Sequence, residues 1–282
     1  MGIKEQSFHL ADGLALSALV TGEETGEVTL CLHGWLDNAA SFLPLLKHLS
    51  QPYVVAIDWP GHGKSSHKSL DNQYHFVDYI ETLYQLCQGN HWQKINVIGH
   101  SMGAMIATAF AAAFPEKVNR LVLIDALGFV CAKEEEATAL LRDGIKSREK
   151  RRKKQKTYYQ NKEEAIEARV AVSDLQKNTA ALIVERSLAQ DENGIYFQND
   201  AKLRNKSLIR LSMKQAKQLV SDVKCSTLLI KGDKGMDMVN KGIVLFADTF
   251  SQLDIISLSG GHHVHMEQPK ETAEAINNFF TI

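Results

Sequence analysis

The sequence predicts an α/β fold in which a mostly parallel sheet, covered by helices on both faces, is interrupted by an inserted helical segment. Short apolar runs rich in β-branched residues recur along the 282-residue chain, with helical patterns between them. This alternation is typical of a doubly wound sheet. It is lost over residues 126–225, where charged amphipathic helix patterns predominate, and it then resumes.

The predicted strands and helices follow one another in a regular order. Two strands open the chain, 7–10 and 14–20, and Asp12-Gly13 between them suits the positive φ angles of a tight hairpin. Buried parallel strands are expected over 28–32, 53–57, 95–98, 118–124, 227–230 and 253–258. Helices are expected over 39–49, 76–87, 102–114, 239–250 and 270–280.

The segment 126–225 divides the predicted core into two parts, residues 1–125 and residues 226–282. No convincing strand pattern lies within this segment, so a helical lid is expected. It begins where strand ends meet, which is the edge at which open α/β sheets bind ligands.

The strongest motif is Gly99-His100-Ser101-Met102-Gly103, which directly follows the predicted strand 95–98 and precedes a helix pattern. This is the setting of a nucleophile elbow, a sharp turn that pushes a serine hydroxyl into a cleft. Glycines relieve the crowding around such a strained residue because they lack Cβ. The motif predicts Ser101 as a nucleophile; a plain strand-to-helix turn is the alternative.

A serine hydroxyl needs an adjacent base to take its proton. His262, His263 and His265 follow the last predicted strand, in a loop expected above the carboxyl edge of the sheet. A histidine cluster can bind a metal, but no carboxylate or thiolate lies at ligand spacing here, so no metal site is predicted. We choose His262 as the base, with His263 as the alternative.

Attack on a carbonyl creates an oxyanion that backbone N–H groups stabilise. One donor is expected from Met102, directly after the nucleophile. The second is expected from Trp35, because Leu32-His33-Gly34-Trp35 ends an early strand and its glycine lets a backbone amide approach the substrate. A simple turn at His33-Gly34 is the alternative.

The composition and charge of the chain limit the classes of binding partner that are expected. The formal net charge is −1, from 32 basic and 33 acidic side chains, so no whole-chain field favours nucleic acid or an anionic membrane. The basic run 146–156 is interpreted as a solvated helix face, because no aromatic residues are interleaved with it. The longest apolar stretch, 104–114, is too short to span a bilayer, and no secretory signal is recognised, so a cytoplasmic location is expected.

Two further features are interpreted as structural. The glycine-rich segment 58–65 ends in Lys64-Ser65 but has Asp58 where a phosphate loop needs glycine, so a turn beside the site is expected. The four cysteines are scattered and form no C-x-x-C pair, which predicts reduced, buried thiols. They are Cys31, Cys87, Cys131 and Cys225.

Together these motifs resemble the α/β-hydrolase superfamily. The segments His33-Gly34-Trp35-Leu36-Asp37-Asn38 and Asp58-Trp59-Pro60-Gly61-His62-Gly63 are most similar to its serine hydrolase-like, esterase-type branch. The resemblance covers nearly the whole predicted sheet domain. It implies a triad in the order serine, acid, histidine, and a lid after the strand that follows the elbow helix. It also implies a base before the Glu-x-Pro segment of the last helix, which corresponds to His262.

The acid of the implied triad has three candidates. The family usually carries it in a Gly-x-x-Asp pattern after the strand 227–230, but this chain has Gly232-Asp233-Lys234-Gly235 there, with Asp237 beyond. Some similar esterases place the acid at the end of the preceding strand, where Asp125 stands. We choose Asp125, which would hold the imidazole tautomer and stabilise the imidazolium; hydrogen bonding to loop amides is the alternative role.

The motifs and the resemblance predict a serine hydrolase that acylates Ser101 and uses His262 first as base and then as acid. A small carboxylic ester is the expected substrate, with amides and thioesters open to the same machinery, and no cofactor is implied. The rival hypothesis, motivated by the displaced acid, is a non-catalytic ligand-binding protein that retains the fold. The sequence indicates neither the identity of the substrate nor an oligomeric state.

Overall fold

The computed structural model describes residues 2–24 and 26–281 and confirms the predicted class of fold. One sheet is built from β1 (Lys4–His9), β2 (Ala15–Gly22), β3 (Val28–Leu32), β4 (Tyr53–Ile57), β5 (Ile95–His100), β6 (Val118–Ile124), β9 (Ser226–Gly232) and β10 (Leu253–Leu258). Its spatial order is β1-β2-β4-β3-β5-β6-β9-β10. The pairs β1–β2 and β2–β4 are antiparallel, and all the others in this sheet are parallel.

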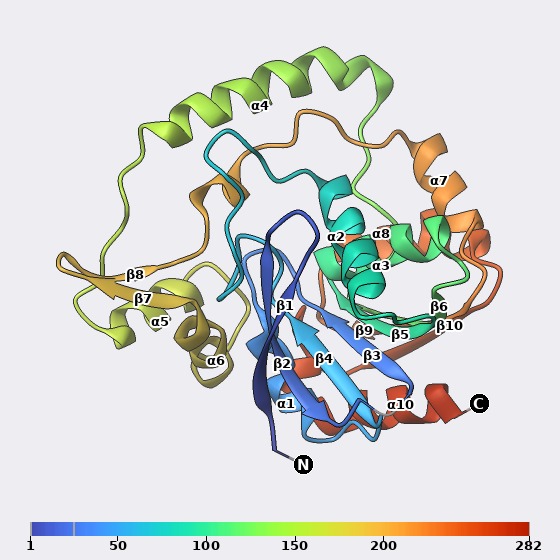
Figure 1. Cartoon of the computed structure of the whole chain (residues 1–282). Coiled ribbons are helices and arrows are strands. Elements are labelled where there is room, and N and C mark those ends of the chain that lie inside the picture. The colour runs from blue at the N-terminus through green and yellow to red at the C-terminus, as the bar shows by residue number, and fades with distance from the viewer. Residues whose placement is uncertain (1, 25, 282) are drawn as a thin grey trace.

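Helices cover both faces of the sheet (Figure 1). Successive strand residues point to opposite faces, so Val97 of β5 belongs to one apolar cluster and Ile98 to the other. The first cluster packs under α2 (Phe76–Gly89), α3 (Met102–Ala113), α7 (Met213–Ser221) and α8 (Asp237–Phe246), which η4 (Ala247–Thr249) extends. The second packs under η1 (Ala39–Phe42), α1 (Leu43–Leu46), α9 (Val264–Glu267) and α10 (Pro269–Thr281).

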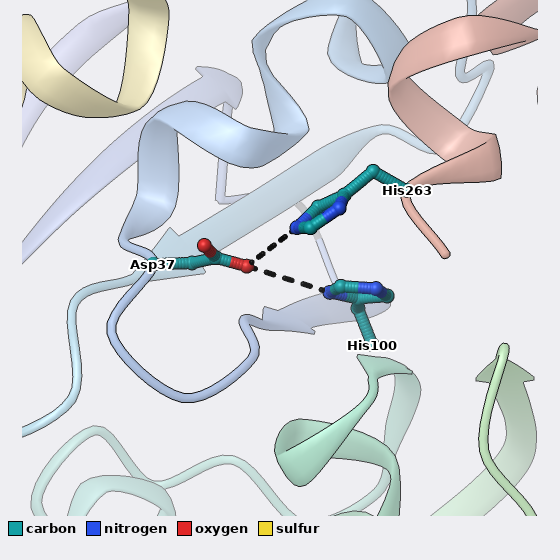
Figure 2. Close-up of side chains that lie close together, drawn as sticks. All are labelled: Asp37, His100 and His263. Atoms are coloured by element: carbon teal, nitrogen blue, oxygen red, sulfur yellow. Dashed lines mark hydrogen bonds and ion pairs between the residues drawn. The ribbon is translucent and has the colours of Figure 1, made fainter. Parts of the chain in front are cut away.

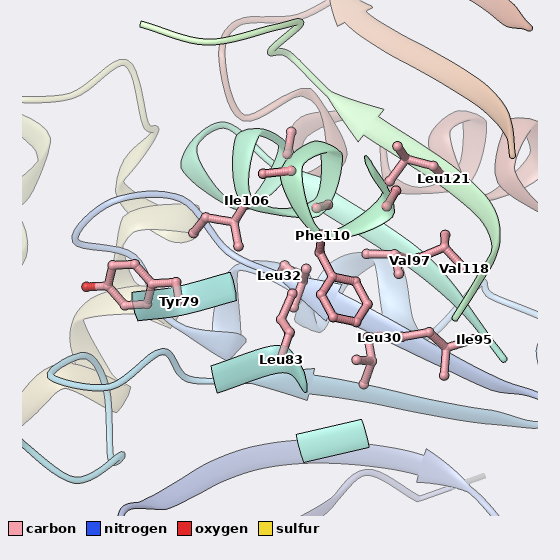
Figure 3. Packing of buried hydrophobic residues seen from close by; sticks show 14 of the residues in the cluster. Leu30, Leu32, Tyr79, Leu83, Ile95, Val97, Ile106, Phe110, Val118 and Leu121 are labelled. Carbon is pink, nitrogen blue, oxygen red and sulfur yellow. The ribbon is translucent and has the colours of Figure 1, made fainter. Parts of the chain in front are cut away.

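The packing of α3 on the sheet matters most for the site. Figure 3 shows Phe110 of α3 pointing toward Leu30 of β3 and Val97 of β5. All three side chains are fully buried, and burying a side chain of this size contributes about 1.5–3 kcal/mol. This layer therefore holds α3, and the residue that precedes it, against the centre of the sheet.

Two predicted elements differ from the structure. The helix expected over 39–49 is a 3-10 turn, η1, followed by the four-residue α1, with Pro44 in its first turn, where a missing N–H is tolerated. The strand β10 was expected to be buried, but its residues are half-buried or exposed, because β10 forms an edge of the sheet.

Two of the four cysteines are buried as expected and two are less buried. Cys31 and Cys87 are buried as predicted, whereas Cys131 and Cys225 are half-buried, and all four are free thiols. Burial raises the pKa of Cys87 to about 12, which keeps this thiol unreactive. No helix within residues 2–24 and 26–281 combines the length and the apolar character needed to cross a bilayer.

The segment between β6 and β9 contains most of the remaining helices. They are η2 (Glu134–Glu136), α4 (Ala137–Arg152), α5 (Lys162–Val170), α6 (Lys177–Ser187), η3 (Ala201–Arg204) and α7. In Figure 1 α4 arches over the molecule far from the sheet, whereas α7 contacts α3 and contributes Ala216 and Val220 to the first core cluster. The part of the segment that is separate from the core therefore ends before α7.

The prediction that residues 126–225 contain no strand is wrong. β7 (Leu188–Asp191) and β8 (Gly194–Phe197) form an antiparallel hairpin, with the Asp191–Gly194 pair at its turn. The two-residue loop is Glu192-Asn193, and the Asn193-Gly194 dipeptide, a hairpin signal, spans the end of this loop and the first residue of β8. The signal was present in the sequence, but the flanking strands are short and half-buried, which weakens their alternation.

A buried ion pair attaches this segment to the core. Arg186 of α6 places its Nε 3.0 Å from both carboxylate oxygens of Asp58. Asp58 also accepts a hydrogen bond from Lys64 N at 2.8 Å, and a Cβ at Gly63 would lie 2.4 Å from its carboxylate. The glycine-rich segment 58–65 is thus a turn wrapped around one carboxylate, in line with its expected structural role.

Candidate active site

Ser101 lies at the turn between β5 and α3, with φ 52° and ψ −117°. A positive φ is uncommon for a residue other than glycine and marks strain. The turn leaves no room for side chains beside it: a Cβ at Gly99 would lie 2.6 Å from Gly103 O, and one at Gly103 would lie 2.1 Å from Leu32 O. The structure therefore contains the strained strand-to-helix turn that the motif predicts.

His262 connects Ser101 to Asp125. Its Nε2 lies 2.9 Å from Ser101 Oγ, and its Nδ1 lies 2.7 Å from Asp125 Oδ2. The three residues follow β5, β6 and β10, so they meet at the carboxyl edge of the sheet. With the Nδ1 proton donated to Asp125, the lone pair of Nε2 faces the serine hydroxyl.

Asp125 is held in place by backbone groups as well as by the imidazole. It directly follows β6 and has a φ of 46°. Its oxygens accept hydrogen bonds from Gly232 N at 3.1 Å and from Met236 N at 3.2 Å. A Cβ at Gly235 would lie 2.2 Å from Asp125 Oδ1. Glycine therefore stands at the position where the resemblance expects the acid because the carboxylate of Asp125 occupies the adjoining space.

The other two candidate acids have different partners. Asp233 accepts a hydrogen bond from Gly260 N at 2.9 Å and so fixes the start of the loop that carries His262. Asp237 is exposed and pairs with Lys241 at 2.7 Å, one turn further along α8. Of the three aspartates, Asp125 is the one whose carboxylate contacts the His262 ring.

The loop after β3 comes close to the serine. A Cβ at Gly34 would lie 3.2 Å from Ser101 Cβ, so a larger residue at this position would crowd the hydroxyl. The indole of Trp35 is turned toward the inserted segment, where its Nε1 donates to Leu203 O at 3.0 Å. Met102 directly follows Ser101 in the chain, and Trp35 directly follows Gly34, which lies close to the serine in space, so both predicted N–H donors belong to residues next to the site.

His263, the alternative base, belongs to a separate buried network. Its Nε2 lies 3.1 Å from Asp37 Oδ2, and its Nδ1 lies 3.0 Å from Asp174 Oδ1. Figure 2 shows Asp37 pointing toward the rings of both His263 and His100, whose Nδ1 is 3.7 Å from the same oxygen. Arg169 of α5 pairs with the other oxygen of Asp37 at 2.6 Å.

The charges of this network shift several pKa values. Burial opposes protonation of His263, but the carboxylates of Asp37 and Asp174 outweigh it and raise the pKa of His263 to about 9. Burial likewise opposes ionisation of Asp174, yet the hydrogen bond and the charge of His263 lower its pKa to about 2. Burial and the neighbouring histidines lower the pKa of His100 well below its usual value. His263 is therefore cationic and His100 neutral at pH 7.

Asp37, His100 and His263 also have the side-chain types of a metal site, and their ligand atoms lie within 4.8 Å of one another. The charges argue against a bound cation. The guanidinium of Arg169 and the protonated His263 already neutralise Asp37, and a further positive charge among them would be repelled. We therefore interpret this group as an ion-pair network.

Asp174 belongs to this network but is not among the site residues predicted from the sequence. It follows α5 in the inserted segment, and its Oδ2 accepts a hydrogen bond from His262 N at 2.6 Å. The inserted segment thus contacts the loop that carries His262. No local pattern could reveal a contact between residues 88 positions apart. Asp37, in contrast, lies inside the motif 33–38 that carried the resemblance, although that motif gave it no role.

Comparisons with known proteins agree with this architecture. The family model described as alpha/beta hydrolase fold matches residues 28–269. A protein named serine hydrolase-like protein from Danio rerio is 30% identical over 278 residues, which cover 94% of this chain and 84% of that protein. A protein named Lipase 1 from Psychrobacter immobilis is 26% identical over 284 residues, or 98% of this chain and 84% of that protein.

A solved structure is similar over nearly its whole length. It is the crystal structure of a hypothetical protein from Pseudomonas aeruginosa PAO1, with 32% sequence identity, a TM-score of 0.91 and coverage of 98% of both chains. Since the family match extends from β3 to the start of α10, the chain belongs to the α/β-hydrolase fold family and is a hydrolase.

Proposed function

We propose that this hydrolase is a serine esterase in which Ser101 is the nucleophile, His262 the general base and Asp125 the acid that orients the base. One observation carries the proposal: a hydrogen-bonded chain runs from Ser101 Oγ through both ring nitrogens of His262 to Asp125, with distances of 2.9 and 2.7 Å. A nucleophile, a base and a third group that orients the base is the arrangement that activates a hydroxyl.

The reaction then follows from proton transfers within this chain. His262 Nε2 takes the hydroxyl proton as Ser101 Oγ forms a bond to the carbonyl carbon of the ester. Collapse of the tetrahedral intermediate breaks the bond to the leaving alcohol, which receives that proton from Nε2. Water then attacks the acyl carbonyl as its proton passes to Nε2, and the bond to Ser101 Oγ breaks as this oxygen takes the proton back from Nε2, which releases the acid and restores the serine. Asp125 stays ionised and stabilises the imidazolium in both halves.

Two backbone N–H groups are proposed to stabilise the oxyanion, those of Trp35 and Met102. The support is the close approach of the Gly34 loop to Ser101 and the position of Met102 at the start of α3, where the first N–H groups of a helix have no partner within the helix. Removing one such donor typically costs about 2.7–4 kcal/mol of transition-state stabilisation.

A small carboxylic ester is the proposed substrate. One relative carries the name of a lipase, which supports esters over amides, and thioesters remain open to the same chemistry. The rival hypothesis of a non-catalytic ligand-binding protein rested on the displaced acid. It loses this motivation because Asp125 contacts His262 from the end of β6.

The proposed location is the cytoplasm. The four cysteines are free, which suits a reducing compartment.

Labelling by a fluorophosphonate probe tests the assignment of the nucleophile. We expect the wild-type chain to be labelled at neutral pH and Ser101→Ala to remain unlabelled, because the probe reacts with an activated serine. A series of p-nitrophenyl esters from acetate to decanoate then measures the acyl preference. Equal labelling of wild type and Ser101→Ala, or no labelling of either, would sink the proposal.

A further inference from the structure

Ser101 and His262 open into a cavity of about 1210 Å³, which also has Trp35, Tyr159 and Phe197 in its wall. Pockets that bind small molecules typically measure about 300–1,000 Å³. The cavity is therefore large enough for a substrate with an additional group remote from the reacting carbonyl.

The same cavity is lined by an excess of basic side chains. The two carboxylates in the lining of the cavity, Asp37 and Asp174, already form ion pairs within the buried network around His263. The basic side chains come from four separate places: the end of α4 and the residues after it, α5, η3 and the loop after β9. They are Arg151, Lys154, Arg169, Arg204 and Lys234.

Most of these basic side chains lack a carboxylate partner. Elsewhere in the inserted segment such partners are common: Arg152 pairs with Glu149 at 2.6 Å and Lys162 with Glu185 at 2.5 Å. Four of the basic side chains that line the cavity form no ion pair with any residue in the part of the chain that the structure describes. They are Arg151, Lys154, Arg204 and Lys234.

Arg151 and Arg204 lie next to each other despite their like charge. Arg151 Nη2 donates to the backbone O of Arg204 at 3.4 Å. Partial burial and the charges of Arg151 and Arg169 lower the pKa of the Arg204 guanidinium, which nevertheless stays protonated. Nε of Arg151 and Nε of Arg169 are buried without a hydrogen-bond partner among the described residues. Guanidinium groups in this state are suited to bind a carboxylate or a phosphate through paired hydrogen bonds.

We propose that the substrate carries an anionic group, a carboxylate or a phosphate, which Arg151 and Arg204 bind while its acyl carbonyl lies at Ser101. This inference rests on the proposed function and narrows its substrate class. It also gives a role to part of the basic run 146–156: Arg151 and Lys154 line the cavity, whereas Arg152 of the same run is exposed and paired with Glu149.

The anionic group can lie on the acyl side or on the leaving group of the substrate. Two matched pairs of compounds distinguish these two positions. Mono-p-nitrophenyl adipate and its methyl ester differ in one carboxylate on the acyl side. S-butyryl-4′-phosphopantetheine and S-butyrylpantetheine differ in one phosphate on the leaving group. We expect kcat/KM to favour the charged member of at least one pair by about tenfold or more, since a hydrogen bond to a charged group contributes a factor of this size. The preference should fall as salt is raised.

Arg151→Gln/Arg204→Gln tests which residues are responsible, with Arg152→Gln as the matched control on the same helix. The double variant should lose about tenfold or more in kcat/KM for the preferred anionic compound and change less than about threefold for its neutral partner. Arg152→Gln should resemble wild type for both. Equal turnover of charged and neutral members by wild type, or equal losses for both in the double variant, would overturn the inference.

Labelling by the fluorophosphonate probe separates the two proposals and covers the case of slow turnover. If wild type is labelled but no compound is hydrolysed, protection of Ser101 by monomethyl adipate and by dimethyl adipate is compared. Stronger protection by the anion, lost in Arg151→Gln/Arg204→Gln, supports the inference; equal protection contradicts it. Absence of labelling would instead reject the proposed nucleophile, and direct binding of the two adipates by calorimetry would then decide on the anion site.

Discussion

Two neighbouring histidines of one loop have opposite surroundings, although each contacts a carboxylate. His262 uses one ring nitrogen on Asp125 and has the hydroxyl of Ser101 at the other. His263 has carboxylates at both, Asp37 and Asp174. A base needs one nitrogen with a free lone pair, whereas a ring between two carboxylates is held as a cation. The second partner of the ring, rather than the presence of an acid, therefore separates the proposed base from the structural cation.

The two histidines also connect different parts of the chain. The contacts of His262 side-chain atoms stay within the sheet domain, at the ends of β5 and β6. The partners of His263 come from the loop after β3 and from the inserted segment, which also supplies Arg169 to Asp37. Asp174 further accepts the backbone N–H of His262. The cation therefore ties the inserted segment to the loop that positions the proposed base.

The two histidines should not be interchangeable in catalysis. His262→Gln should lower kcat for p-nitrophenyl butyrate by about 10⁵–10⁶, as loss of the base does in other serine hydrolases. His263→Gln should lower kcat by no more than about tenfold, because the contacts of Ser101, His262 and Asp125 remain. Initial rates at pH 7, with folding checked by circular dichroism, provide the measurement. A larger loss in folded His263→Gln than in His262→Gln would reverse the assignment.

The carboxylate that contacts His262 offers the next test. Asp125→Asn should lower kcat by about 10³–10⁴, since an asparagine at this position favours the wrong imidazole tautomer. Asp237→Asn is the matched control, because Asp237 is exposed and pairs with Lys241 away from the imidazole; its kcat should stay within about twofold of wild type. Steady-state kinetics on one ester compares the two variants. Similar small losses in both would remove Asp125 from the mechanism.

The sequence predicted the sheet and the residues nearest the serine because these features have local signatures. Strand and helix periods repeat within each element, and the glycines around Ser101 mark a turn that is crowded over a few residues. The choice among Asp125, Asp233 and Asp237 needed the resemblance, since a carboxylate after a strand is a local feature but its partner is not. Gly235 became informative only once its missing Cβ was seen beside Asp125.

The ion-pair network around His263 could not be predicted from local sequence patterns. Its pairs join residues far apart in sequence, such as Asp37 with Arg169 and Asp174 with His263, and no periodic pattern records such contacts. The interpretation of the run 146–156 as a solvated face illustrates the same point: the lining of the cavity by Arg151 depends on where α4 ends, which packing decides. Local sequence patterns thus predict the helices and strands, whereas the partners of their charged residues are determined by tertiary contacts.

The smallest expected effect concerns stability and follows from the charge of His263. Its pKa is raised from the ordinary 6.5 to about 9 in the folded state. A raised pKa means that the folded state binds the proton more tightly, so the stabilisation is fully present below pH 6.5 and is lost as pH rises through 9. The shift corresponds to at most about 3 kcal/mol. The pKa of Asp174 is lowered to about 2 in the folded state. Its contribution to stability is therefore present at neutral pH and is lost as pH falls from 4 toward 2.

Thermal unfolding between pH 6 and pH 10 measures the contribution of the His263 charge to stability. The melting temperature of wild type should fall by several degrees over this range, since about 1 kcal/mol corresponds to roughly 2–4 °C in a chain of this size. In His263→Gln the fall should be smaller, because glutamine has no proton to lose, and the two curves should converge at high pH. Other titrating groups are shared by both proteins, so the difference between the curves isolates His263. Parallel curves would show that its charge is not part of what holds the inserted segment to the core.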